Sequence, residues 1–176
     1  MNNTMNFEQI YQSQFNVVSE KYPKGSEVFA NGKVYKVVDY FGYGEKYGVV
    51  GVDREGNEQE ILDNDLQPIK YKVCGRCGGS GRFSYNLKDG STCYGCTGLG
   101  KNVLAPVGFP QKIKSVCVVS LEKFGFKEGQ EINAEFCGFS KTGGTPKYAV
   151  TNNNTKVGNV IMYSTITKHF NVMVVK

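Results

Sequence analysis

The sequence predicts a mainly β protein that begins with one short helix. Apolar residues fall in short runs separated by glycine-containing turns, and the 176-residue chain holds 22 Gly but only 5 Pro. Hydrophobic residues make up 40% of the chain and charged residues 21%, which is typical of a chain with a folded core. We expect four segments: a helical segment 1–24, a β-domain 25–69, a cysteine-rich segment 70–101 and a second β-domain 102–176.

The helix is predicted between residues 7 and 22, where apolar and aromatic side chains recur every three or four residues. These side chains are Phe7, Ile10, Tyr11, Phe15, Val18 and Tyr22. Pro23 and Gly25 end the pattern. We expect the helix to cover one face of the neighbouring sheet.

Five short strands are predicted between Ser26 and Ile69, with turns at Asn31-Gly32 and at residues 54–57. Short strands at this density favour a small, strongly bent barrel. A Lys-Gly-Ser-Glu-Val opening, a central Tyr-Gly-Val-Val-Gly-Val-Asp run and the closing residues 66–69 resemble an SH3-like or KOW-like barrel. Such a resemblance implies a fold without fixing a function, because these barrels serve many functions.

Strand-like runs resume after Pro110 and predict a second small β-domain, which shows no sequence repeat of the first. The runs cover residues 113–121, 131–139, 148–150, 157–167 and 170–175. Cys117 and Cys137 lie within these runs, where we expect free thiols to act as small hydrophobic side chains. His169, the single histidine, is expected to be a surface or strand residue rather than a ligand.

Residues 74–81 and 93–100 both read Cys-x-x-Cys-x-Gly-x-Gly, and the 15 residues between the two cysteine pairs match the spacing of zinc sites. Each pair directs two sulfurs toward one point, and the glycines let the backbone wrap closely around them. We therefore predict that one structural Zn²⁺ is bound by Cys74, Cys77, Cys93 and Cys96. Four thiolates leave no position for a reactive water, and no thioredoxin-like pattern surrounds the pairs, so a catalytic metal or a redox pair is less favoured.

These two repeats resemble the cysteine-rich zinc domain of DnaJ-type chaperones. That family has four repeats and two zinc ions, whereas two repeats suffice for one ion. The family's His-Pro-Asp signature is absent, since His169 is followed by Phe170. The resemblance thus implies a zinc knuckle with a peptide-binding or scaffolding role, and it does not extend to stimulation of a heat-shock ATPase.

Residues 70–101 are here called the knuckle segment. They contain six Lys and Arg and one Asp, a net charge of +5, which is the same as the net charge of the whole chain. Because aromatic residues are interleaved with these cations, the leading hypothesis is a non-enzymatic protein that binds RNA or single-stranded DNA. The predicted phosphate contacts are Arg76, Arg82, Lys88 and Lys101, and the predicted stacking residues are Phe83, Tyr85 and Tyr94. An equally open interpretation is that the cations solvate a small hairpin while the aromatic rings cover the zinc site.

The main alternative is a protein-interaction adaptor that uses its barrel and its DnaJ-like knuckle; a third is a structural part of a virion or replisome. The asparagine-rich, compact layout resembles accessory proteins of phages and mobile elements. Phosphate-binding loops, dinucleotide fingerprints and nucleophile motifs are absent from the sequence, so we expect neither an enzyme nor an organic cofactor. Without an apolar run long enough for a membrane span or a secretory signal, the expected location is the cytoplasm, that of the host for a phage protein.

Overall fold

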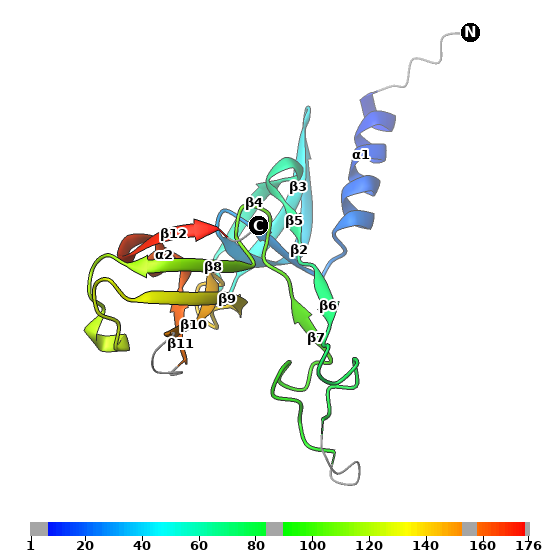
Figure 1. Cartoon of the computed structure of the whole chain (residues 1–176). Helices are drawn as coiled ribbons and strands as arrows, with labels where there is room; N and C mark the ends of the chain where they lie inside the picture. Colours follow the sequence, from blue (N-terminus) through cyan, green and yellow to red (C-terminus); the bar gives the residue numbers. More distant parts are fainter. Residues whose placement is uncertain (1–6, 84–89, 153–157, 175–176) are drawn as a thin grey trace. The chain divides into compact units, whose positions relative to one another are not determined.

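A computed structural model of the chain describes residues 7–83, 90–152 and 158–174 (Figure 1). These residues form three antiparallel sheets and two α-helices, which confirms the mainly β fold class. The chain divides into two compact units. The first unit comprises Met1–Ile69 and Phe139–Thr145, and the second comprises Lys70–Gly138 and Pro146–Lys176.

The sheet of the first unit has the strand order β4-β3-β2-β1-β5. Its elements are β1 (Glu27–Ala30), β2 (Lys33–Tyr43), β3 (Lys46–Asp53), β4 (Glu58–Leu62), the 3-10 turn η1 (Asp63–Asp65) and β5 (Gln67–Pro68). The last strand returns to pair antiparallel with the first, through Val28 with Pro68 and Phe29 with Gln67. The pairing register of β2 with β3 shifts between Val37 and Asp39, a bulge of the kind that increases the bend of a strand.

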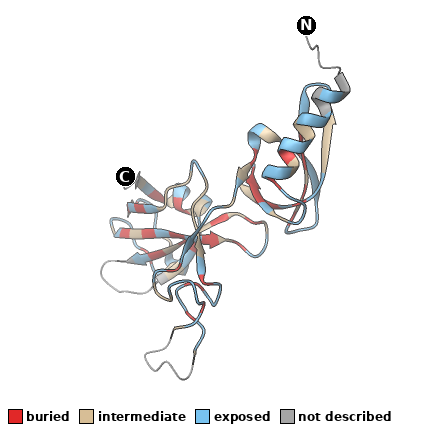
Figure 2. Cartoon of the chain, turned by 90° about the vertical axis from the view of Figure 1, so that its right-hand side faces the viewer, coloured by how far each residue is buried: buried red, intermediate tan, exposed pale blue. Residues whose placement is uncertain are grey.

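Helix α1 (Phe7–Lys21) packs against β2 and β3 of this sheet. Val18 and Tyr22, at the C-terminal end of the helical segment, are each only 1% exposed. The Tyr22 hydroxyl donates a hydrogen bond to the Leu66 carbonyl at 3.1 Å, and the Phe15 ring meets Tyr40 edge-on at 5.2 Å. Figure 2 shows the buried residues of the unit concentrated where the helix meets the strands, so the helix closes one face of the core.

The segment Phe139–Thr145, which runs from the end of β9 (Glu131–Phe139) to the start of β10 (Pro146–Asn152), completes the first unit. The Phe139 ring stacks on Phe29 at 5.6 Å, and the Val34 N–H donates to the Gly144 carbonyl at 3.2 Å. Gly144 has φ +60°, and a Cβ there would lie 2.8 Å from the Val34 nitrogen. This approach requires glycine at that position.

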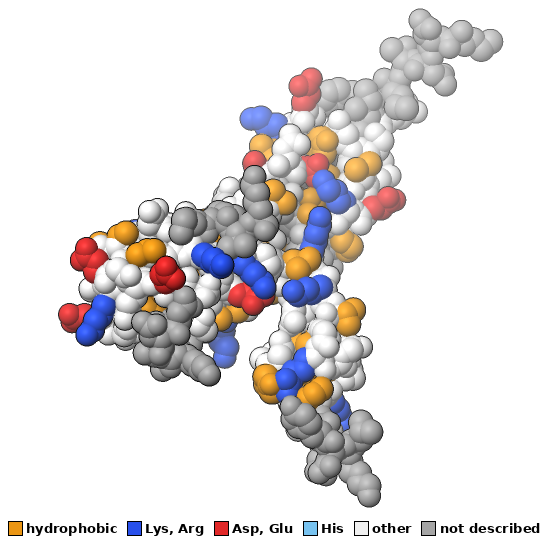
Figure 3. All heavy atoms as spheres, viewed as in Figure 1, with side chains coloured by type: hydrophobic (Ala, Val, Ile, Leu, Met, Phe, Trp, Pro, Cys, Tyr) orange, Lys and Arg blue, Asp and Glu red, His pale blue; other side chains and the backbone are white. Residues whose placement is uncertain are grey.

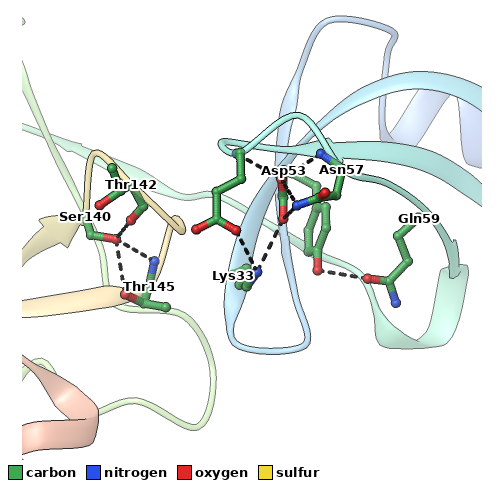
Figure 4. A network of polar contacts seen from close by, with 9 residues as sticks. Lys33, Asp53, Asn57, Gln59, Ser140, Thr142 and Thr145 are labelled. Carbon is green, nitrogen blue, oxygen red and sulfur yellow. Dashed lines mark hydrogen bonds and ion pairs between the residues drawn. The ribbon is translucent and has the colours of Figure 1, made fainter.

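Two local polar networks stabilise turns of the first unit (Figure 4). Asp53 Oδ1 accepts from the backbone N–H groups of Glu55 at 2.9 Å and Asn57 at 3.0 Å, which closes the turn between β3 and β4. Ser140 Oγ accepts from the Thr145 N–H at 3.0 Å and so closes the 139–145 segment.

The sheet of the second unit has the order β11-β10-β9-β8-β12. Its elements are β8 (Lys112–Cys117), the 3-10 turn η2 (Glu122–Phe124), β9 (Glu131–Phe139), β10 (Pro146–Asn152), β11 (Gly158–Met162), helix α2 (Tyr163–His169) and β12 (Phe170–Val174). Position by position this is the strand order of the first sheet, with α2 where the first sheet has η1. The structure thus reveals a common topology that the sequence did not indicate.

Two expectations for this unit require correction. Only the first part of the strand predicted over 157–167 is extended; Tyr163–His169 is the helix α2, because burial of Ile166 outweighs the strand preference of its β-branched neighbours. Cys117 is buried as expected, whereas Cys137 is exposed, because it alternates outward along β9. His169 is the last residue of α2. In the described ranges, neither helix has the length and apolar character needed to cross a membrane.

Candidate metal centre

The cysteine motifs are held together by a short two-stranded stem. Strands β6 (Tyr71–Val73) and β7 (Lys101–Val103) pair antiparallel, and the Leu104 N–H donates to the Lys70 carbonyl at 2.8 Å (Figure 1). Because the stem encloses residues 74–100, it brings the start of the first motif next to the end of the second.

The four predicted ligands, Cys74, Cys77, Cys93 and Cys96, converge on one point. All four sulfur atoms lie within 4.8 Å of one another. The Sγ–Sγ distance is 3.9 Å between Cys74 and Cys93 and 3.7 Å between Cys77 and Cys96. A tetrahedral zinc site with Zn–S bonds of about 2.3 Å has sulfur–sulfur edges of about 3.8 Å. The cysteines are therefore positioned to bind one metal ion.

The two motifs bind each other through equivalent backbone hydrogen bonds. The Cys74 N–H donates to the Gly100 carbonyl at 2.9 Å, and the Cys93 N–H donates to the Gly81 carbonyl at 2.9 Å. The first cysteine of each motif thus contacts the last glycine of the other. The two glycines share the left-handed backbone conformation, with φ +72° at Gly81 and +71° at Gly100.

The close packing of the two motifs explains why the last residue of each is glycine. A Cβ on Gly81 would lie 2.2 Å from the Gly98 carbonyl oxygen, and a Cβ on Gly100 would lie 2.1 Å from that of Gly79. These separations are far inside van der Waals contact with rigid backbone, so no side chain fits at either position.

The backbone also affects how the thiols ionise. Burial raises the pKa of Cys77, but the N–H groups of Gly81 and Gly79 outweigh it and lower the pKa to about 6. At Cys96, burial and the neighbouring sulfurs raise the pKa to about 11, against the Gly100 N–H that donates to this sulfur at 3.2 Å. Negative charges this close repel one another, so the full thiolate set needs a cation at its centre. The donor set therefore fits a divalent metal that prefers sulfur.

The structure describes five of the seven predicted nucleic-acid contacts: Arg76, Arg82, Phe83, Tyr94 and Lys101. The Arg76 guanidinium lies between two aromatic rings, 3.6 Å from the ring centroid of Tyr94 and 4.1 Å from that of Phe83. Phe83 also packs against the cysteines, while Tyr94 is 73% exposed. Lys101 Nζ lies 4.1 Å from the Tyr71 ring centroid.

Arg82 is exposed and forms a β-bridge with Thr92 at the base of the hairpin. Tyr85 and Lys88 lie outside the described residues. Tyr71, between Lys70 and Lys72, is one of the aromatic residues interleaved with the cations, but the sequence did not predict it as a stacking residue. Figure 3 shows basic and hydrophobic side chains side by side at the knuckle segment.

Charge is divided unequally between the two units. The second unit contains fourteen Lys and Arg and five Asp and Glu, a net charge of +9, whereas the first contains seven and eleven, a net charge of −4. All five ion pairs found among the described residues lie in the first unit. The unit that carries the cysteine cluster is therefore strongly cationic, and its described cations are not neutralised by ion pairs.

Comparison of the chain with family models, curated proteins and solved structures gave no match. The resemblance to DnaJ-type zinc domains consequently rests on the two cysteine motifs alone, and what is established at this site is a four-cysteine cluster with metal-binding geometry.

Proposed function

We propose that the protein is a zinc-stabilised, non-enzymatic binding protein whose second unit binds single-stranded nucleic acid, either RNA or DNA. The observation that carries this proposal is the net charge of +9 on the unit that contains the cysteine cluster. Four thiolates around Zn²⁺ add −2 in place of neutral thiols, so a large positive charge remains. Such a surface attracts phosphates over a distance of about 8–10 Å at physiological salt.

Zinc is the ion we propose for the cluster, because a tetrahedral set of four thiolates suits Zn²⁺ and leaves no open coordination position. Its role is structural, since the described residues between 74 and 100 have little apolar core beyond the cysteines and Phe83. Elemental analysis of the purified protein is expected to give one zinc per chain. Cobalt substitution should give the intense visible bands of tetrahedral thiolate coordination, and iron in place of zinc would contradict this assignment.

Nucleic-acid binding is tested by fluorescence anisotropy with labelled single-stranded RNA, single-stranded DNA and duplex DNA at two salt concentrations. We expect the single strands to bind and the affinity to fall steeply with salt, because phosphate contacts release counterions. Arg82→Glu should weaken binding, whereas Lys36→Glu, the same charge change at an exposed site of the first unit, should have a much smaller effect. Salt-independent binding or no binding would contradict the proposal.

A protein-interaction adaptor is the second candidate, and one observation favours it. Leu99 is 70% exposed and Val73 is 66% exposed on the knuckle segment, and exposed apolar side chains mark interaction surfaces when they cluster. Under this alternative, Leu99→Asp would impair capture of a partner protein, while Arg82→Glu would leave it nearly unchanged.

A further inference from the structure

Two adjoining cavities of the second unit form one groove. A cavity of about 290 Å³ is lined by Lys72, Gly95 and Asn102 of the knuckle region together with residues of β9 and β10. A second cavity of about 370 Å³ lies over β8, β9 and β10. Glu135 and Ala149 line both cavities, so the space continues from the knuckle onto the sheet. We call it the β8–β10 groove.

The groove presents three lysines. Along β8, Ile113 and Ser115 are buried, which turns Lys112 and Lys114 to the exposed face that lines the groove. Lys72, from β6, lines the end nearer the knuckle. All three are exposed and form no ion pair with the described residues. Glu135, opposite Lys112 in the strand register, is the single acidic residue of the lining.

The rest of the lining includes small and polar side chains. Gly95, Cys137 and Ala149 are small, and Asn102 and Thr151 add polar groups at the two ends of the groove. With three lysines and one acidic residue, the lining offers phosphate contacts to a single extended strand. We propose that one strand of nucleic acid lies in the β8–β10 groove with its phosphates on Lys72, Lys112 and Lys114. This inference rests on the proposed function. It places the phosphates on lysines other than the predicted contacts Arg76, Arg82, Lys88 and Lys101.

The test compares two triple variants of the full chain with wild type. Lys72→Ala/Lys112→Ala/Lys114→Ala removes the groove cations, and Lys123→Ala/Lys127→Ala/Lys168→Ala removes three exposed cations of the same unit outside the groove. Binding of a labelled oligo-dT and an oligo-U is measured over a salt series. Each lost phosphate contact on a single strand lowers the slope of log affinity against log salt by about 0.7, so the groove variant should lose about 2 from the slope and bind about tenfold more weakly.

The outcomes separate the groove from the general function. If wild type binds no oligonucleotide, both the proposed function and the groove assignment are wrong. If wild type binds and the two triple variants weaken binding equally, the groove assignment is overturned while the proposed function stands. A different result is that wild type binds a poly-glutamate peptide more tightly than either oligonucleotide and loses that binding in the groove variant. This result would show that the groove binds acidic peptides and would overturn nucleic acid as its ligand. Thermal melts of both variants confirm that they remain folded.

Discussion

At the scale of single residues, the knuckle segment depends on contacts between glycine and backbone as much as on its thiols. The first repeat has Gly78 where the second has Thr97, and both residues adopt positive φ, +59° and +51°. This position therefore accepts a side chain, although at a conformational cost. Gly81 and Gly100 differ from it, because the carbonyl of the other repeat occupies the place of a side chain.

We therefore expect Gly81→Ala to weaken metal binding far more than Gly78→Ala. The first places a Cβ 2.2 Å from a carbonyl oxygen and forces the two repeats apart, while the second meets no atom within 4 Å and costs about 1 kcal/mol of left-handed strain. Competition with a chromophoric chelator measures the metal affinity of each variant. Equal affinities would show that the repeats do not pack as closely as described.

Asp53 makes the first unit sensitive to acid. Its side chain is 4% exposed, and its pKa is lowered to about 2, chiefly by the Asn57 N–H, with further lowering from the Asn57 amide, the Glu55 N–H and Lys33. Because the folded-state pKa is lower than the unfolded value of about 3.9, the stabilisation is complete above that value and is lost as the pH falls from about 4 to about 2.

Carbon-detected NMR titration of the Asp53 carboxyl should therefore give a midpoint near the lowered value. In thermal melts between pH 5 and pH 2, Asp53→Asn should lose less stability than wild type. A midpoint near that of an ordinary aspartate would contradict the hydrogen-bonding network.

The ligand set was predictable from the sequence because the spacing of Cys74, Cys77, Cys93 and Cys96 is a local property that a metal imposes directly. The position of Arg76 between Phe83 and Tyr94 was not, since it depends on how the two repeats meet across the hairpin. The phosphate contact of Arg76 stays a prediction, and the structure adds that its guanidinium lies against the two rings.

At the scale of elements, the stem and the two sheets have separate sources of stability. Each sheet packs apolar residues on one face, as Val49 does in the first and Ile132 in the second, whereas residues 74–100 cluster around sulfur. Loss of the metal should therefore act on the knuckle segment before the sheets.

Cys93→Ser, or a strong chelator, is expected to unfold residues 74–100 and leave both sheets folded, since structural zinc contributes about 10–16 kcal/mol to isolated fingers. Limited proteolysis with mass spectrometry should show new cleavage between Cys74 and Gly100. Cys137→Ser, which replaces an exposed thiol outside the cluster, provides the control. Unchanged protease resistance in Cys93→Ser would contradict a stabilising metal.

The Tyr22 hydroxyl, directly after helix α1, makes one of the contacts that hold the helical segment on its sheet. Tyr22→Phe removes the hydrogen bond to the Leu66 carbonyl and leaves that acceptor buried, at a cost of about 1–2 kcal/mol in unfolding free energy. Tyr43→Phe removes a hydroxyl that donates to the Glu60 carboxylate at the surface, where water can replace the bond because Tyr43 is 57% exposed, and it should cost under about 0.5 kcal/mol. Urea denaturation of both variants measures the difference, and equal costs would argue against the helix packing described.

The strands were predictable where apolar residues alternate, as over Glu131–Phe139, because the period of two is a local signal. Helix α2 was not, because Thr165, Ile166 and Thr167 favour strands and only the burial of Ile166 within the assembled unit selects the helix. The lysine alternation Lys112-Ile113-Lys114 was visible in the sequence, but the groove it lines needs β9 and β10 beside it.

At the scale of the whole molecule, the two units carry opposite net charges, and we expect these charges to direct a polyanion to one of them. The second unit, at +9, should bind it, and the first, at −4, should not. Lysine acetylation footprinting with and without a single-stranded oligonucleotide is expected to protect Lys72, Lys112 and Lys114 but not Lys36 or Lys46. Protection spread evenly over both units would contradict this division.

The membership of Phe139–Thr145 in the first unit has a consequence for synthesis on the ribosome. The first unit cannot finish folding when Ile69 emerges, because the Phe139 ring that stacks on Phe29 and the Gly144 carbonyl that accepts from the Val34 N–H are translated much later. At about 5–20 residues per second, the wait from Ile69 to Thr145 lasts about 4–15 s. During that interval the Phe29 ring lacks its stacking partner, so completion of the first unit waits until much of the second has been translated.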